Sequence, residues 1–65
     1  MQPKGKIVKD ARGFWAVYIK KSIFSPFKPV KDKYGEPMVL HFKNSAIHYL
    51  VEHCNVLTKD VLIVE

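Results

Sequence analysis

The side chains that could bind a metal ion or act as a nucleophile lie in the second half of the chain. They are the three histidines and the single cysteine, His41, His48, His53 and Cys54. Metal ligands on one helix stand three or four residues apart, whereas His48 and His53 are five apart. Cys54 ends a helical stretch, where the helix dipole disfavours a thiolate. We therefore expect no metal site and a packed thiol.

Acid–base catalysis needs titratable groups that converge in a cleft. The six carboxylates are scattered along 65 residues, and neither a Ser/His/Asp arrangement nor a Gly-rich phosphate loop accompanies them. A domain this small also has little chain from which to build a deep cleft. We therefore expect no catalytic residue, no cofactor and no enzymatic activity.

Positive charge is the clearest chemical signal. The formal net charge is +5, and residues 1–33 hold nine of the eleven lysines and arginines but only two of the six carboxylates. The excess of ammonium groups in this half of the chain favours a polyanionic partner. Arginine, which reads bases and phosphates with a bidentate fork, occurs once, so any nucleic-acid contact should be mainly to the phosphate backbone.

Aromatic rings alternate with lysines in the strand-like residues 14–21. A period of two separates Phe14, Tyr18 and Lys20 from Trp15 on the opposite face. Rings and lysines on an open sheet face suit nucleic acid, because bases stack on rings and phosphates pair with ammonium groups. The expected nucleic-acid-binding residues are Lys6, Lys9, Arg12, Phe14, Tyr18, Lys20, Lys21, Lys28, Lys31 and Lys33. DNA is expected as the partner in preference to RNA.

Two alternatives stay open for the same residues. The sheet face could form a second buried layer under residues 23–30, or an interface with a partner protein or a second copy of the chain. The large aromatic residues outside the regular elements would then be anchors, and they are Phe24, Phe27 and Tyr34. Under this alternative the protein is a small adaptor or inhibitor, and a homodimer is possible.

A helix over residues 42–55 is the element on which the rest of the fold depends. Ile47, Leu50, Val51 and Cys54 follow the helical spacing i, i+3, i+4 and i+7 and define one apolar stripe. Asn44 or Ser45 is the expected N-cap, and Asn55 the residue of positive φ that ends the helix. The stripe requires a sheet beneath it, which predicts an α+β fold.

The remaining segments supply that sheet. Strands are expected at residues 5–10, 14–21, 38–42 and 61–64, with a turn at 11–13, which gives the order β-β-β-α-β in a small, mainly antiparallel sheet of three or four strands. Residues 22–37 are expected as an irregular basic loop, of which 27–31 runs as an edge strand opposite 38–42. The 65 residues should form one domain, with residues 1–4 flexible.

Composition limits the setting of the protein. With 48% hydrophobic and 26% charged residues the chain is typical of a globular protein, and its single cysteine excludes an internal disulfide. The longest apolar run, residues 14–19, is far shorter than the roughly 20 residues of a membrane span. We expect a complete, soluble, cytoplasmic protein that does not enter a membrane.

The layout of two short strands with a Trp in the second, then a third strand and a helix, is similar to the arm-site DNA-binding domains of tyrosine integrases. The resemblance covers roughly residues 6–54 and implies a DNA-binding role. It assigns no DNA contact to any particular residue of this chain. Residues 42–44 approximate the Phe-x-Thr-like entry into the helix of that family, whereas its basic helix face is absent and strand 61–64 is additional. Small basic α+β proteins of phages and mobile elements share this layout, and some of them bind host enzymes.

Overall fold

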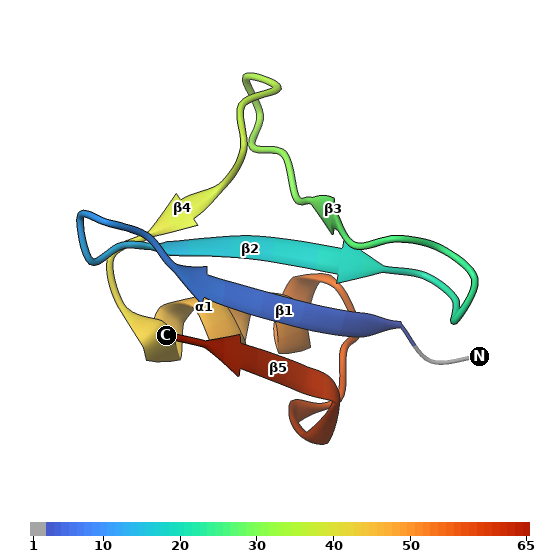
Figure 1. Ribbon diagram of the computed structural model, residues 1–65. Coiled ribbons are helices and arrows are strands. Elements are labelled where there is room, and N and C mark those ends of the chain that lie inside the picture. The colour runs from blue at the N-terminus through green and yellow to red at the C-terminus, as the bar shows by residue number, and fades with distance from the viewer. Residues whose placement is uncertain (1–2) are drawn as a thin grey trace.

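The computed structural model describes residues 3–65 and contains one helix packed against one sheet (Figure 1). This confirms the expected α+β class. The elements in chain order are β1 (Lys4–Lys9), β2 (Trp15–Lys20), β3 (Lys28–Pro29), β4 (Val39–Leu40), α1 (Lys43–His53), a 3-10 turn (Thr58–Asp60) and β5 (Val61–Val64). Of the residues expected to be flexible, 1 and 2 lie outside the described residues, and Lys4 is the first residue of β1.

The sheet is mixed but mainly antiparallel. β1 pairs antiparallel with β2 on one side and parallel with β5 on the other. β3 and β4 both pair antiparallel with the outer edge of β2. The parallel arrangement of β5 requires a crossover, and α1 supplies it by carrying the chain across one face of the sheet from β4 to β5 (Figure 1).

The β1–β2 turn is organised by one carboxylate. Asp10 Oδ1 accepts hydrogen bonds from the backbone N–H groups of Arg12 and Phe14, both at 2.9 Å. The Asp10 N–H donates to the carbonyl of Phe14 at 2.8 Å, and Gly13 has a φ of 86°, which a residue without a Cβ adopts at little cost. This turn sets the register in which Ile7 lies opposite Val17.

The edge strand beyond β2 is split at Val17. The Val30 N–H donates to the Val17 carbonyl at 2.9 Å, and the Val17 N–H donates to the Met38 carbonyl at 3.4 Å. Val30 and Met38 thus both lie opposite Val17. Between these two residues the chain leaves the sheet as the loop of residues 31–37, which is closed by a bridge from Lys31 to Pro37. The expected pairing of residues 27–31 with 38–42 is therefore confirmed only where the two segments meet: the Met38 N–H donates to the Val30 carbonyl at 2.7 Å, and Lys31 bridges Pro37. Further along, β3 and β4 each pair with β2 instead of with each other.

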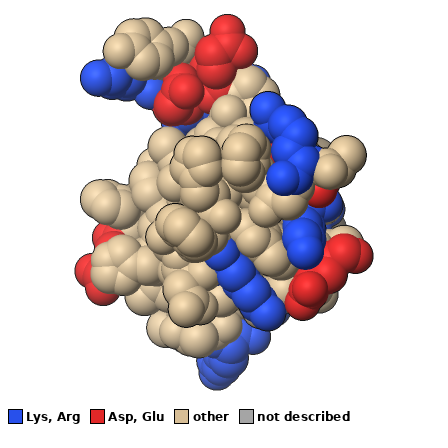
Figure 2. Space-filling view, turned by 90° about the vertical axis from the view of Figure 1, so that its left-hand side faces the viewer, with Lys and Arg blue, Asp and Glu red and all other residues tan. Residues whose placement is uncertain are grey.

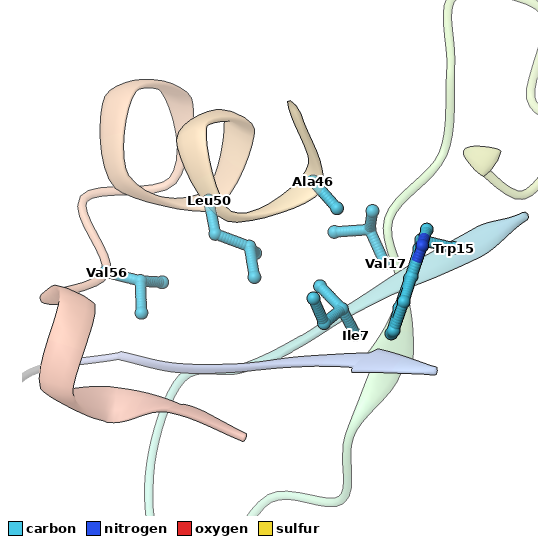
Figure 3. Close-up of a cluster of buried hydrophobic side chains, with 6 residues drawn as sticks. All are labelled: Ile7, Trp15, Val17, Ala46, Leu50 and Val56. Atoms are coloured by element: carbon cyan, nitrogen blue, oxygen red, sulfur yellow. The ribbon is translucent and has the colours of Figure 1, made fainter. Parts of the chain in front are cut away.

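The core lies between α1 and the central strands. Its buried side chains come from β1, β2, α1 and the segment after α1, and Figure 3 shows them converging: Ile7, Trp15, Val17, Ala46, Leu50 and Val56. The helix therefore faces the sheet through Ala46 and Leu50, whereas Val51 of the predicted stripe is only half-buried. A small Ala carries little weight in a hydrophobic pattern, although its size lets the helix approach the sheet closely.

The carboxyl end of α1 lies where the sequence predicts it, whereas the amino end does not. Asn55 has a φ of 58°, and the N–H groups of Cys54 and Val56 both donate to the Leu50 carbonyl, at 3.2 and 3.1 Å. The predicted helix stop is confirmed. The N-cap, however, is Phe42, with no side-chain hydrogen bond, because the helix begins at Lys43, before either predicted cap.

Candidate nucleic-acid interface

The sheet face opposite α1 carries both apolar and basic side chains, and we call it the open face. Trp15, Val17 and Ile19 pack on the helix side as expected. The strand registers therefore place on the open face Lys4, Lys6, Val8, Ala16, Tyr18, Lys20, Val39, Leu62 and Val64. Three of the expected nucleic-acid-binding residues, Lys6, Tyr18 and Lys20, are thereby brought together.

Lys4, Lys6 and Lys20 lie at the end of this face where β1 begins and β2 ends, which is the right-hand end of the sheet in Figure 1. Lys4 and Lys20 are directly opposite cross-strand partners, and Lys6 is the partner of Tyr18. Like charges in directly opposite positions of a sheet repel each other and destabilise the pair. The arrangement is therefore a local concentration of positive charge that the fold holds in place.

The ring of Phe27 packs among these ammonium groups. Its centroid lies 4.8 Å from Lys6 Nζ and 5.1 Å from Lys20 Nζ. Lys6 Nζ also lies 5.1 Å from the centroid of Tyr18. Ammonium groups are attracted to the faces of aromatic rings, so the two rings hold the lysines in position on the open face.

A shallow hollow of about 320 Å³ adjoins the lysines. It is lined by Lys4, Gly5, Lys20, Phe27, Lys59, Asp60, Val61 and Leu62. Lys59 reaches it because β5 pairs in parallel with β1, which brings the 3-10 turn beside the start of β1. Within the hollow, the Asp60 carboxylate lies 3.4 Å from Lys4 Nζ. We refer to Lys4, Lys6, Lys20 and Lys59 as the lysine cluster.

The far end of the open face is differently built. Arg12 pairs with the Asp10 carboxylate at 3.0 Å, and its guanidinium lies 4.9 Å from the ring centroid of Phe14. Phe14 in turn meets His41 edge to face at 4.6 Å between ring centroids. Partial burial alone would raise the pKa of Asp10. Hydrogen bonds from the Arg12 side chain and from the Phe14 and Arg12 backbone have a larger combined effect in the opposite direction, so the pKa of Asp10 lies below its usual value. The positive charge of Arg12 thus has the Asp10 carboxylate as its partner.

The other expected lysines lie away from the cluster. Lys9 and Lys28 share their registers with Trp15 and Ile19, on the helix side of the sheet. Lys21 is exposed just after β2.

The two remaining lysines, Lys31 and Lys33, belong to the loop of residues 31–37, which stands away from the body at the top of Figure 2. Basic and acidic side chains are mixed there, because the loop also contains Asp32 and Glu36. Asp32 Oδ1 accepts the N–H groups of Tyr34 and Glu36 at 2.8 and 3.0 Å, which makes the loop a closed turn. Its charges cancel, so it is not a basic arm.

Sequence reasoning missed two members of the cluster. Lys4 stands in a segment expected to be loose, and Lys59 belongs to the acidic half of the chain. Lys59 reaches the site because β5 pairs in parallel with β1, and no local sequence pattern predicts that pairing. Phe27 was expected as a protein anchor, whereas it contacts two lysines of the cluster.

The histidines, Cys54 and the carboxylates, which are the side chains that could bind a metal ion or act in catalysis, do not gather at one place in residues 3–65. Among residues 3–65, no three His, Cys, Asp or Glu side chains lie close enough together to hold a metal ion. His53 stacks on Tyr49 with ring centroids 4.8 Å apart. Burial raises the pKa of the Cys54 thiol, which packs against the core and stays protonated at neutral pH.

Comparison with known proteins gives no family for this chain. No family model matches the sequence, no curated protein matches it, and no solved structure matches the fold. The likeness to arm-site domains of integrases therefore gains no support beyond the order of elements. Within residues 3–65, the one helix, α1, is too short and too polar to cross a membrane.

Proposed function

We propose that this protein is a non-enzymatic nucleic-acid-binding module that holds the phosphate backbone through the lysine cluster. DNA is expected as the partner in preference to RNA, and the cytoplasm is the expected location. The observation that carries the proposal is the direct cross-strand pairing of Lys4 with Lys20, beside Lys6 and Lys59, with Asp60 as the one carboxylate lining the hollow.

The argument rests on the repulsion within this cluster. Lys4 and Lys20 face each other directly across β1 and β2, with Lys6 and Lys59 nearby, and the Asp60 carboxylate offsets only part of this positive charge. A bound polyanion relieves the repulsion that is left. Phosphates that bind lysines also release condensed counterions, which adds a salt-dependent driving force. A nucleic-acid backbone supplies phosphates at regular spacing and can therefore contact several lysines of the cluster at once.

The aromatic rings suggest how the contact is made. Lys6 already lies over Tyr18 and Phe27, and Arg12 over Phe14, so a base that stacks on any of these faces must displace a cation. Backbone contact needs no such displacement. We therefore infer binding with little sequence preference, in which the rings position the lysines instead of stacking on bases.

Fluorescence anisotropy tests this proposal. Labelled duplex DNA, single-stranded DNA and RNA of equal length would be titrated at about 50 and 200 mM salt. Contact with three or four phosphates predicts that the logarithm of affinity falls with the logarithm of salt concentration with a slope of about −3. Absence of binding at low salt, or binding that ignores salt, contradicts the proposal.

A second candidate function has its own observation. Phe24 is 89% exposed and Ile23 60% exposed, in the turn after β2 that leads to Phe27. Adjacent apolar side chains with this exposure are typical anchors of a protein interface. If the protein is an adaptor, Phe24→Ala should abolish capture of its protein partner and leave nucleic-acid affinity unchanged.

A further inference from the structure

The hollow beside the lysine cluster has a defined net charge. Its charged side chains are three lysines and one carboxylate, which together give +2: Lys4, Lys20, Lys59 and Asp60. A phosphate inside a nucleic-acid strand carries a single negative charge, whereas a phosphate monoester at the end of a strand carries about 1.5 to 2 at pH 7. The charge of the hollow therefore matches that of a terminal phosphate better than that of an internal one.

Two of these lysines are able to take an anion without breaking an ion pair of the protein. The Asp60 side chain is only 15% exposed, and its Oδ1 accepts a hydrogen bond from Lys4 Nζ at 3.4 Å. This contact holds the Lys4 ammonium group at the hollow. Lys20 and Lys59, in contrast, form no ion pair with a carboxylate among residues 3–65. They are therefore the groups to which a phosphate would bind first.

The hollow also has room and apolar surface for more than a phosphate. Its volume of about 320 Å³ lies at the lower end of the roughly 300–1,000 Å³ that is typical of sites for small molecules. Val61 and Leu62 contribute apolar lining, and the Leu62 side chain is 54% exposed. The sugar and base of a nucleotide would cover Leu62, whereas a phosphate alone would leave it in water. The hollow therefore suits a nucleotide at the end of a strand.

We propose that the hollow binds the phosphorylated end of a nucleic-acid strand, with the terminal phosphate paired with Lys20 and Lys59. This inference rests on the proposed function and adds to it a preference for strand ends that carry a phosphate monoester. Lys6 lies two residues beyond Lys4 on the same face of β1, about 7 Å further along the sheet. The strand that leaves the hollow over the open face therefore brings an internal phosphate to Lys6.

Displacement of an internally labelled DNA strand, followed by fluorescence anisotropy, tests the preference. Three unlabelled single strands of one sequence carry a 5′-phosphate, a 3′-phosphate or no terminal phosphate, and their comparison shows which end the hollow accepts. A fourth strand lacks a terminal phosphate but is two nucleotides longer, so that it matches the charge of the phosphorylated strands. We expect one phosphorylated end to raise affinity about five- to tenfold, and the longer strand to gain less than about twofold.

Two variants of equal net charge assign the preference to the hollow. Lys59→Gln should abolish the gain from the terminal phosphate, with an unchanged circular dichroism spectrum, because Lys59 is an exposed residue of the 3-10 turn. The matched control is Lys9→Gln, at the far end of β1, which should keep the gain. Equal affinity for strands with and without a terminal phosphate, or an equal gain from the longer strand, overturns the site and leaves the proposed function standing. Absence of binding to every strand refutes both.

Nuclear magnetic resonance locates the phosphate. Deoxyadenosine 5′-monophosphate, titrated to millimolar concentration into the isotopically labelled protein, should shift the backbone amide signals of Gly5, Asp60 and Val61 most, because these residues line the hollow. Deoxyadenosine, which has no phosphate, is the control and should shift them little. The largest shifts in the loop of residues 31–37 or around Arg12, or equal shifts with the two compounds, would overturn the assignment of the terminal phosphate to the hollow.

Discussion

Leu50 of α1 packs directly on the backbone of Gly5 in β1. A Cβ built on Gly5 would lie 2.7 Å from Leu50 Cδ1, and Leu50 is fully buried. Gly5→Val should therefore lower the free energy of unfolding by about 1–3 kcal/mol, as overpacking does, although Val is favoured in strands. Urea denaturation measures the change.

The same substitution in a Leu50→Ala background provides the control. With the Leu50 methyl groups removed, the Val side chain has room, and its cost should fall close to zero. An unchanged cost of Gly5→Val in that background would show that the contact with Leu50 is not its cause.

Deletion of residues 31–37 should leave the sheet intact. Val30 and Met38 already oppose Val17 as two residues of a β-bulge do, so their direct connection requires little movement. We expect a change in unfolding free energy within about 1 kcal/mol and the same near-ultraviolet signal from Trp15. Because Lys31 and Lys33 are balanced by Asp32 and Glu36, nucleic-acid affinity should also be retained. Loss of binding on deletion would assign the loop a role that its charges do not support.

Asp10 makes stability depend on pH in a defined direction. Its pKa is lowered in the folded protein by hydrogen bonds from Arg12 and from the turn backbone, so it stabilises the fold above its ordinary pKa. That contribution is lost as pH falls through the lowered pKa, below about pH 4. Asp10→Asn should therefore be less stable than the parent at pH 7, and thermal denaturation at a series of pH values should show the gap closing in acid. A gap that is constant with pH would contradict this assignment.

Phe27 should matter for affinity through the lysines that it holds. Phe27→Ala removes the ring that lies within about 5 Å of both Lys6 Nζ and Lys20 Nζ, so these side chains gain freedom and affinity for DNA should fall several-fold. The slope of affinity against salt should change little, because the charges remain. Phe24→Ala, which removes an exposed ring three residues away, is the matched control and should bind as the parent does.

Local patterns in the sequence were sufficient for the single helix, its end at Asn55 and the strand at Trp15, because spacing and residue type decide these features. The split edge at Val17 depends on which hydrogen-bonding partner is free along β2, and no periodicity encodes that. Ala46 entered the core because a small residue lets the helix approach the sheet, which a hydrophobic pattern undervalues.

The candidate site shows the same division. Alternation along β2 correctly placed Tyr18 and Lys20 on one face. Lys59 belongs to the lysine cluster only because β5 pairs in parallel with β1, and this contact joins segments more than fifty residues apart in the sequence. Charge counted along the chain likewise misjudged the loop of residues 31–37, since its basic and acidic side chains fold together into one turn.

One comparison of two double variants tests the central claim most directly. Lys6→Gln with Lys20→Gln removes two charges from the lysine cluster, and Lys31→Gln with Lys33→Gln removes two from the distant loop, so the net charge is the same in both. Fluorescence anisotropy with duplex DNA should show at least about a tenfold loss of affinity and a salt slope reduced by about two for the first variant alone. Equal losses in the two variants would show that affinity follows net charge, and would contradict a phosphate-binding site on the open face.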